Sequence, residues 1–229
     1  MNARKALRQG NAAAAGRWVC LDVGETLIDE TRVFQAWADE LGIPQFTAMA
    51  VLGGSIASAR SSTDWRGFFD LLQRPDWRDH RAAVEKRYGG FRETDLYPDA
   101  HRAIDGLRAA GYRVAISANQ PARRHAELQA LGLQVEMMAM SEAIGVAKPD
   151  PAFFSRTLEL LGSPDPSQVA YVGDRVDNDL VPAAAMGMRA VWIRRGPWGL
   201  LQEDATSAAR LVVGTLDELV DRIGEAWSD

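Results

Sequence analysis

Residues 18–27 read Trp-Val-Cys-Leu-Asp-Val-Gly-Glu-Thr-Leu, and the pattern of this stretch indicates both a fold class and a site. Its first four residues form a short apolar run, which is typical of a buried strand in a parallel sheet. Asp22 follows this run directly and stands before a Gly-Glu-Thr turn. A carboxylate at the end of a buried strand is costly unless a metal ion or a phosphate group stabilises it. Asp22 is therefore the first candidate functional residue.

Polar residues end two further apolar runs downstream. Ser117 follows residues 114–116, and Asp174 follows residues 169–173. Ligands of open parallel sheets bind in the crevice at the carboxyl ends of the strands. We therefore expect Asp22, Ser117 and Asp174 to meet at one site.

From about Pro98 onward, the pattern alternates between strand and helix. The predicted strands cover residues 113–117, 135–140, 169–172, 189–193 and 211–213. The stretch that contains Gly196-Pro197 and Gly199 is predicted to be a loop. Repeated βα units of this kind predict an α/β fold, a doubly wound parallel sheet with helices on both faces.

Residues 30–96 break this alternation, because they contain amphipathic helical patterns and no convincing strand. A helical insertion directly after the first strand would lie over the strand ends, where a lid belongs. We therefore expect a flexible leader over residues 1–16, an α/β core over 17–29 and 97–229, and a small helical cap over 30–96.

Composition excludes several classes of protein. The chain has 229 residues, 47% of them hydrophobic, and a formal net charge of −5. It has three lysines and no basic stripe, so we expect no nucleic-acid partner. The single cysteine, Cys20, allows no intramolecular disulfide. No stretch is long and apolar enough to span a membrane or to form a signal-peptide core, so we expect a cytoplasmic protein. The sequence leaves open whether it is a monomer or a homodimer.

Four short motifs occur in order along the chain, each in a strand-and-loop context. They are Asp22-Val23-Gly24-Glu25-Thr26, then Ser117, then Lys148 before Pro149-Asp150-Pro151, then Gly173-Asp174 followed by Asp177 and Asp179. Together they resemble the motifs of the haloacid dehalogenase superfamily, most of whose members are phosphatases. The resemblance covers essentially the whole chain after the leader.

The resemblance implies a Rossmann-like core, a Mg²⁺ cofactor and a small phosphorylated metabolite as substrate. It implies that Asp22 is a nucleophile that forms an aspartyl-phosphate, with Ser117 and Lys148 as further catalytic residues. The implied substrate-binding residues are Ser117, Ala118, Asn119 and Lys148. The implied metal ligands are Asp22, the carbonyl of Gly24, Asp174 as a direct ligand and Asp179 as a supporting one. Carboxylate and carbonyl oxygens suit Mg²⁺, which would neutralise charge on the transferred phosphoryl group.

Gly24 departs from the family pattern. Phosphatases of this family have an aspartate here, which protonates the leaving oxygen and later activates water. Gly24 keeps a backbone carbonyl for the metal but has no proton donor. General acid–base catalysis contributes about 10²–10⁴-fold, so the departure is a large one. Glu25 could substitute for the missing acid, or it could be a turn residue with no catalytic role. If proton transfer is missing, Gly24→Asp should raise the turnover of poor leaving groups.

Three alternatives remain open on the sequence alone. A 2-haloacid dehalogenase also lacks this aspartate, but it needs no metal and would leave the acidic residues 174–179 without a purpose. A phosphonatase-like hydrolase would use a cap lysine, for which Lys86 is the only candidate in the insertion. The fold could also be kept as a weakly active or inactive binding protein.

The sequence leaves the substrate-specificity residues undecided. Arg60, Trp65 and Arg66 in the insertion could contact a substrate, or Trp65 could pack the helical cap while the arginines face water. Exposed tryptophans near Trp198 could mark an interface, but the sequence does not show which of the seven tryptophans are exposed.

Overall fold

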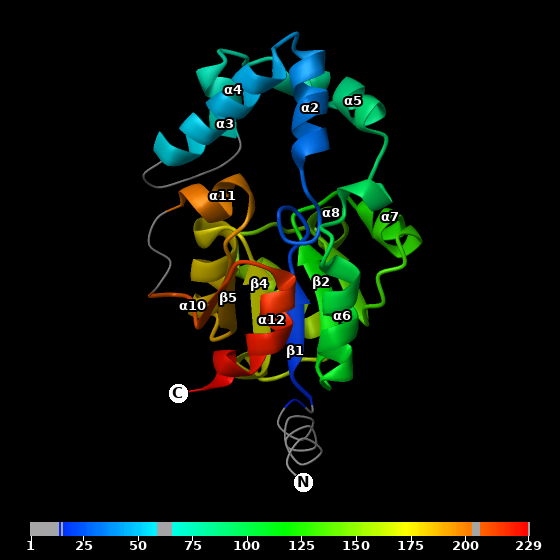
Figure 1. The fold of residues 1–229 in the computed structure, drawn as a ribbon, viewed down its shortest axis with the longest axis vertical. Coiled ribbons are helices and arrows are strands. Elements are labelled where there is room, and N and C mark those ends of the chain that lie inside the picture. The colour runs from blue at the N-terminus through cyan, green and yellow to red at the C-terminus, as the bar shows by residue number, and fades with distance from the viewer. Residues whose placement is uncertain (1–13, 15, 59–65, 203–206, 229) are drawn as a thin grey trace.

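A six-stranded, wholly parallel sheet forms the centre of the molecule (Figure 1). The computed structural model describes residues 14, 16–58, 66–202 and 207–228. The strands in sheet order are β3 (Met137–Met140), β2 (Arg113–Ala118), β1 (Trp18–Leu21), β4 (Val169–Gly173), β5 (Arg189–Ile193) and β6 (Leu211–Val213). This confirms the predicted doubly wound α/β sheet, with β1 in the interior of the sheet.

Helices cover both faces of the sheet because successive side chains of each strand point to opposite faces. Val19 and Leu21 pack on one face in the same core cluster as residues of α6 (Ala100–Ala109) and α12 (Leu216–Arg222). Trp18 and Cys20 pack on the other face with α9 (Pro151–Leu160). The remaining core helices are α7 (Arg124–Ala130), α8 (Ser141–Ile144), α10 (Val181–Ala185) and α11 (Gly196–Leu201).

The parallel register brings three strand ends to one edge. Leu21 of β1 is aligned with Ile116 of β2 and with Val172 of β4. The backbone N–H of Asp22 donates to the carbonyl of Val172 at 2.9 Å, which carries the alignment one residue past β1. Asp22, which follows Leu21, and Ser117, which follows Ile116, therefore lie at the same edge of the sheet.

Four helices lie beyond this edge of the sheet and form a layer above it (Figure 1). They are α2 (Thr31–Glu40), α3 (Gln45–Ser58), α4 (Arg66–Leu71) and α5 (Trp77–Tyr88), which we call the cap helices. Their buried residues form a hydrophobic cluster of their own, in which Phe69 stacks on Trp77 with ring centroids 4.9 Å apart. The described part of the insertion is thus helical and contains no strand. Among the described helices, none is long and apolar enough by itself to cross a membrane, and the pair α2 and α3, which together would pass on length and composition, is bent by 114°.

One local prediction was wrong. The predicted loop around Gly196 contains the helix α11, which starts with Pro197 in its first turn, a position where proline's fixed φ favours a helix. Trp198 of α11 is buried and joins the hydrophobic cluster of the cap helices. The helix after β4 begins with a π-helical turn, Val176–Leu180, before α10. Arg60, Trp65 and most of the predicted leader lie outside the described residues.

Candidate active site

Three side chains at the strand edge form a buried chain of ion pairs. The ammonium of Lys148 lies 2.7 Å from Oδ1 of Asp22 and 2.6 Å from Oδ1 of Asp179. Burial alone would lower the pKa of Lys148, but the carboxylates of Asp179 and Asp22 outweigh it and raise that pKa. Lys148 is therefore a permanent cation between two carboxylates. We call Asp22, Lys148, Asp174 and Asp179 the strand-end cluster.

Asp174 adds a third carboxylate that this lysine does not neutralise. Single carboxylate oxygens of Asp22, Asp174 and Asp179 all lie within 4.8 Å of one another. Oδ2 of Asp174 is fully buried and has no hydrogen-bond partner among the described residues. Burial, followed by the charges of Asp179 and Asp22, raises the pKa of Asp174 well above its usual value. The cluster thus has three buried carboxylates and one ammonium, and Oδ2 of Asp174 lacks a hydrogen-bond partner among the described residues. This surplus of negatively charged oxygen ligands fits a hard divalent cation.

Ser117 lies beside Asp22 but turns its hydroxyl to the α9 side of the sheet. It is fully buried, and its Oγ is 2.7 Å from Oγ1 of Thr157. Its carbonyl accepts a hydrogen bond from the hydroxyl of Tyr171 at 2.7 Å. Ala118 is also fully buried, packed in the core. The side chains of Ser117 and Ala118 do not line the cavity described below, so their role as substrate ligands stays a prediction.

Asn119 fixes the loop that carries Lys148. Its Oδ1 accepts from the backbone N–H of Lys148 at 2.7 Å, and its Nδ2 donates to the carbonyl of Lys148 at 2.9 Å. This reciprocal pair orients the lysine backbone so that its side chain reaches Asp22. Asn119 also lines the cavity, so it can both position Lys148 and face a ligand.

A cavity of about 300 Å³ opens between the strand-end cluster and the cap helices. The predicted site residues that line it are Asp22, Gly24, Asn119, Lys148 and Asp174. On the cap side, Phe34 and Trp37 of α2 and Arg81 of α5 complete the wall, and Trp198 of α11 closes it from the core. Trp198 lies in the stretch predicted as a loop, and no local sequence signal marked it as a cavity residue.

Glu30 is a cavity-lining residue that the sequence motifs did not indicate. It precedes α2, and its carboxylate lies directly over the Cα of Gly24. A Cβ added to Gly24 would lie 2.6 Å from Oε1 of Glu30, which is closer than real Cβ atoms approach any neighbour. Burial, followed by the charges of Glu25 and Asp22, raises the pKa of Glu30 to about 8. Gly24 therefore leaves open a space that the Glu30 carboxylate fills.

Glu25 has a structural role in the turn. Its φ is 51°, in the left-handed region, so its backbone is not in the extended conformation of the preceding strand. Its Oε2 accepts from the hydroxyl of Tyr97 at 2.5 Å, and its Oε1 accepts from the backbone N–H of Glu30 at 2.8 Å. A Cβ on Gly196 would clash with this carboxylate at 2.2 Å. Both oxygens of Glu25 are thus used to fix the turn and the start of α2.

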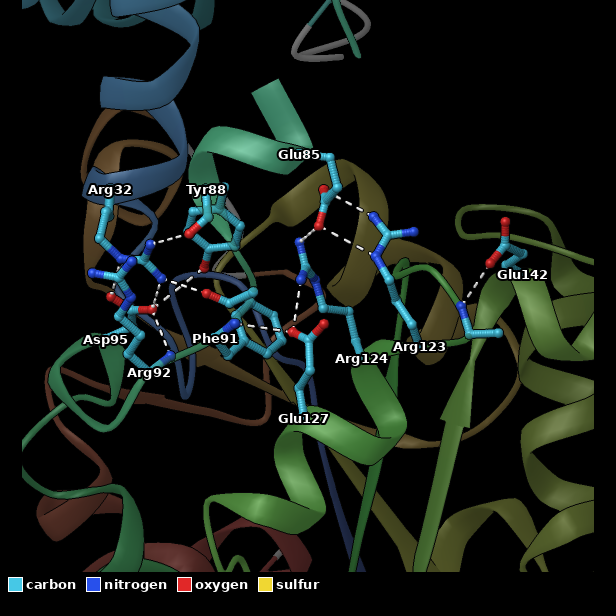
Figure 2. A network of polar contacts seen from close by, with 12 residues as sticks. Arg32, Glu85, Tyr88, Phe91, Arg92, Asp95, Arg123, Arg124, Glu127 and Glu142 are labelled. Carbon is cyan, nitrogen blue, oxygen red and sulfur yellow. Dashed lines mark hydrogen bonds and ion pairs between the residues drawn. The ribbon is translucent and has the colours of Figure 1, made fainter. Parts of the chain in front are cut away.

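A second set of charges holds the chain segments that connect the cap helices to the core (Figure 2). The guanidinium of Arg32 donates to both oxygens of Asp95 and to the carbonyls of Tyr88 and Gly90. The backbone N–H of Arg92 also donates to Asp95, at 2.8 Å. We call Arg32, Tyr88, Gly90, Arg92 and Asp95 the linker network.

Ion pairs beside the linker network join α5 to α7 (Figure 2). Glu85 of α5 lies 2.8 Å from the guanidinium of Arg123 and 2.8 Å from that of Arg124. Arg124 also pairs with Glu127 of its own helix at 2.6 Å. These contacts place the last turns of α5 against the core and help to position α5, which also carries Arg81, over the cavity.

Comparison with known proteins places this geometry in a family. Residues 17–187 match the family model of haloacid dehalogenase-like hydrolases. The chain is 29% identical over 197 residues to a phosphoserine phosphatase of Thermus thermophilus, covering 81% of this chain and 77% of that protein. It is 35% identical over 139 residues to a glyceraldehyde 3-phosphate phosphatase of Methanopyrus kandleri, covering 57% and 59%. The chain thus spans about three fifths of the length of the second relative.

Solved structures show the same fold. A HAD phosphatase from Thermococcus onnurineus superposes with a TM-score of 0.58 and 26% identity, covering 91% of this chain and 98% of that one. An L-2-haloacid dehalogenase from Xanthobacter autotrophicus superposes with a TM-score of 0.66 at 19% identity, covering 91% and 98%. At that identity the likeness shows the fold alone, so the site residues must distinguish the two activities.

Proposed function

We propose that this chain, which belongs to the haloacid dehalogenase-like hydrolase family, is a Mg²⁺-dependent phosphatase that uses Asp22 as its nucleophile. The single observation that carries the proposal is the surplus of carboxylate in the strand-end cluster. Asp22, Asp174 and Asp179 converge with one ammonium between them, and a buried oxygen of Asp174 lacks a partner among the described residues. Such a cluster is unfavourable unless a cation joins it.

Asp22, Asp174 and the carbonyl of Gly24 would hold the ion, and Asp179 would support it. When bound, Mg²⁺ supplies positive charge that offsets the negative charge of the phosphoryl group. Asp179 accepts from Lys148 and, at 3.0 Å, from the backbone N–H of Arg175, so its oxygens already have partners. Its part is therefore to hold Lys148 and the loop in place.

The residues of the chain can carry out phosphoryl transfer in two steps. An oxygen of Asp22 attacks phosphorus, the P–O ester bond breaks, and an aspartyl-phosphate forms on Asp22. Water then attacks the phosphorus and releases inorganic phosphate and the free carboxylate. Lys148 lies beside Asp22 throughout and stabilises negative charge on the reacting oxygens.

The cavity supports a small phosphorylated substrate. Its volume of about 300 Å³ suits a metabolite rather than a polymer. The cap side presents the rings of Phe34 and Trp37 together with the guanidinium of Arg81, so the leaving group would meet an apolar wall with one cationic group. The names of the relatives, phosphoserine phosphatase and glyceraldehyde 3-phosphate phosphatase, are compatible with this class of substrate.

The alternative hydrolases have less support. A metal-free dehalogenase would leave the buried Asp174 oxygen without a purpose. A phosphonatase would need a lysine of the cap in the cavity, but Lys86 is exposed on α5 and does not line it.

The test is phosphate release from p-nitrophenyl phosphate and a panel of phosphorylated metabolites, with Mg²⁺ and with EDTA. We expect Mg²⁺-dependent release that Asp22→Asn abolishes. Asp29→Asn is a control, because Asp29 lies outside the cavity. Halide release from 2-haloacids in EDTA, without phosphate release in Mg²⁺, would contradict the proposal.

A further inference from the structure

The proposed reaction needs a group that protonates the leaving oxygen, and Gly24 of the first motif cannot supply it. The structure contains another residue at this place. A side chain at position 24 would point toward the carboxylate of Glu30, and Gly24, Glu30 and Asp22 all line the cavity. Glycine leaves that volume empty of its own side chain. The carboxylate of Glu30 fills it, with Oε1 2.6 Å, Cδ 2.8 Å and Oε2 3.2 Å from the position of a Cβ on Gly24.

Local structure holds Glu30 in this place. Its backbone N–H donates to Glu25, whose other oxygen accepts from Tyr97, so the start of α2 is tied to the turn after β1. Glu30 itself lines the cavity together with Asp22 and Lys148. Glu25, the alternative that the sequence offers, has both of its oxygens engaged in this tie.

We propose that Glu30 is the general acid and base of the reaction, and that its carboxyl group replaces the side chain that Gly24 lacks. This inference rests on the proposed phosphatase function. In the first step, the ester P–O bond breaks as the Glu30 O–H gives its proton to the leaving oxygen, and the product is a neutral alcohol. In the second step, the Glu30 carboxylate takes a proton from the water that attacks the aspartyl-phosphate, which restores the starting carboxyl group. No other reactant is needed.

The position of Glu30 changes the expectation for Gly24→Asp. The end of the Glu30 side chain would have to shift to make room for an aspartate at position 24, and the aspartate would add a second carboxyl group where one already lies. The single variant should therefore not raise the turnover of poor leaving groups. The double variant Gly24→Asp/Glu30→Ala removes the Glu30 carboxyl group and supplies a carboxylate in the same volume, so it should keep or regain activity.

The test compares two substrates of nearly the same shape, p-nitrophenyl phosphate and phenyl phosphate. Nitrophenolate leaves readily without a proton, whereas phenolate is more basic and needs one. For Glu30→Gln we expect kcat/KM on phenyl phosphate to fall by about 10²–10⁴-fold, and on p-nitrophenyl phosphate by less than about tenfold. Because the second step also loses its base, nitrophenolate should appear in a burst of one equivalent followed by slow turnover.

Two further variants separate catalysis from folding. Glu25→Gln should change both substrates by the same factor, since it acts through the turn. Gly24→Asp/Glu30→Ala should recover turnover of phenyl phosphate relative to Glu30→Ala, which a merely structural role of Glu30 would not allow. Equal losses on the two substrates for Glu30→Gln, or no recovery in the double variant, would overturn the inference while leaving the phosphatase intact. A wild-type protein without activity on p-nitrophenyl phosphate in Mg²⁺ would overturn both.

Discussion

The strand-end cluster and the linker network both contain buried carboxylates, but the carboxylates of the two sets differ in their hydrogen-bond partners. In the linker network, Asp95 receives two hydrogen bonds from Arg32 and one from the backbone N–H of Arg92. Burial acts to raise the pKa of Asp95, yet these partners keep it below its usual value. In the strand-end cluster, Asp174 has an oxygen without a partner among the described residues, and its pKa is raised.

The difference separates a structural set of charges from a functional one. A carboxylate whose pKa is lowered contributes to the stability of the fold, because the folded state favours its charged form. A carboxylate whose pKa is raised costs stability in the absence of a ligand, and such residues concentrate at functional sites. The linker network therefore positions the cap helices, whereas the strand-end cluster has the surplus negative charge expected of the proposed cation site.

The largest effect is expected from Lys148→Met. The substitution leaves Asp22 and Asp179 buried without their cation, so the free energy of unfolding should fall by about 3–5 kcal/mol. Phosphate release should fall by at least about 10²–10³-fold, because the positive charge beside Asp22, the proposed nucleophile, is lost. Urea denaturation and a phosphate assay measure the two effects. Lys86→Met is the matched control, since Lys86 is exposed, and it should change stability by less than about 0.5 kcal/mol. Unchanged stability in Lys148→Met would contradict the described ion pairs.

A smaller loss of stability is expected from Arg32→Met, which breaks the linker network. Asp95 is buried, but Arg32 is about a quarter exposed, so we expect a loss of about 2–3 kcal/mol, below the range for a fully buried pair. The folded Arg32→Met protein should hydrolyse p-nitrophenyl phosphate at nearly the wild-type rate. Arg156→Met removes an exposed pair on α9 and serves as the control, with a loss of at most about 1 kcal/mol. If Arg32→Met lost activity without losing stability, the linker network would have a catalytic role, which would contradict its structural role.

The smallest effect concerns pH. The folded-state pKa of Asp95 is lowered, so its contribution to stability is present above its unfolded pKa of about 3.9 and is lost as pH falls through the folded value. The stability difference between wild type and Arg32→Met should therefore be constant from pH 7 to about pH 5 and shrink below about pH 4. Urea denaturation at pH 7, 5 and 3.5 measures it. A difference that grows toward low pH would mean that Asp95 is not charged in the folded protein.

Much of the fold follows from local patterns in the sequence. The apolar runs at 113–117, 169–172 and 189–193 predicted β2, β4 and β5 to within one residue, because buried parallel strands are short and apolar throughout. The helix α11 was not predicted because its first residues are Gly196 and Pro197, and glycine and proline are common in loops. It is held by packing of Trp198 among the cap helices, a contact between segments far apart in the sequence.

The site was predictable where one strand end supplies one residue. Asp22 and Asp174 converge as their positions directly after β1 and β4 indicate. Lys148, in the loop between α8 and α9, and Asp179, in the π-helical turn, were indicated only by the resemblance to the family motifs. The position of Glu30 was not predictable in the same way. Its approach to Gly24 depends on the left-handed turn at Glu25 and on the tie to Tyr97, and neither is visible in residue spacing.

Cation binding by the strand-end cluster is tested directly by the effect of Mg²⁺ on the melting temperature of the wild type and of Asp174→Asn, after removal of metal with EDTA. Binding at about one hundred times Kd adds about 2.7 kcal/mol, which corresponds to a rise of about 5–10 °C for a chain of this size. We predict that rise for the wild type relative to KCl of equal ionic strength. We predict little or no rise for Asp174→Asn, which should be at least as stable as the wild type when metal is absent. A wild type that does not respond to Mg²⁺, or an Asp174→Asn variant that responds equally, would contradict the account.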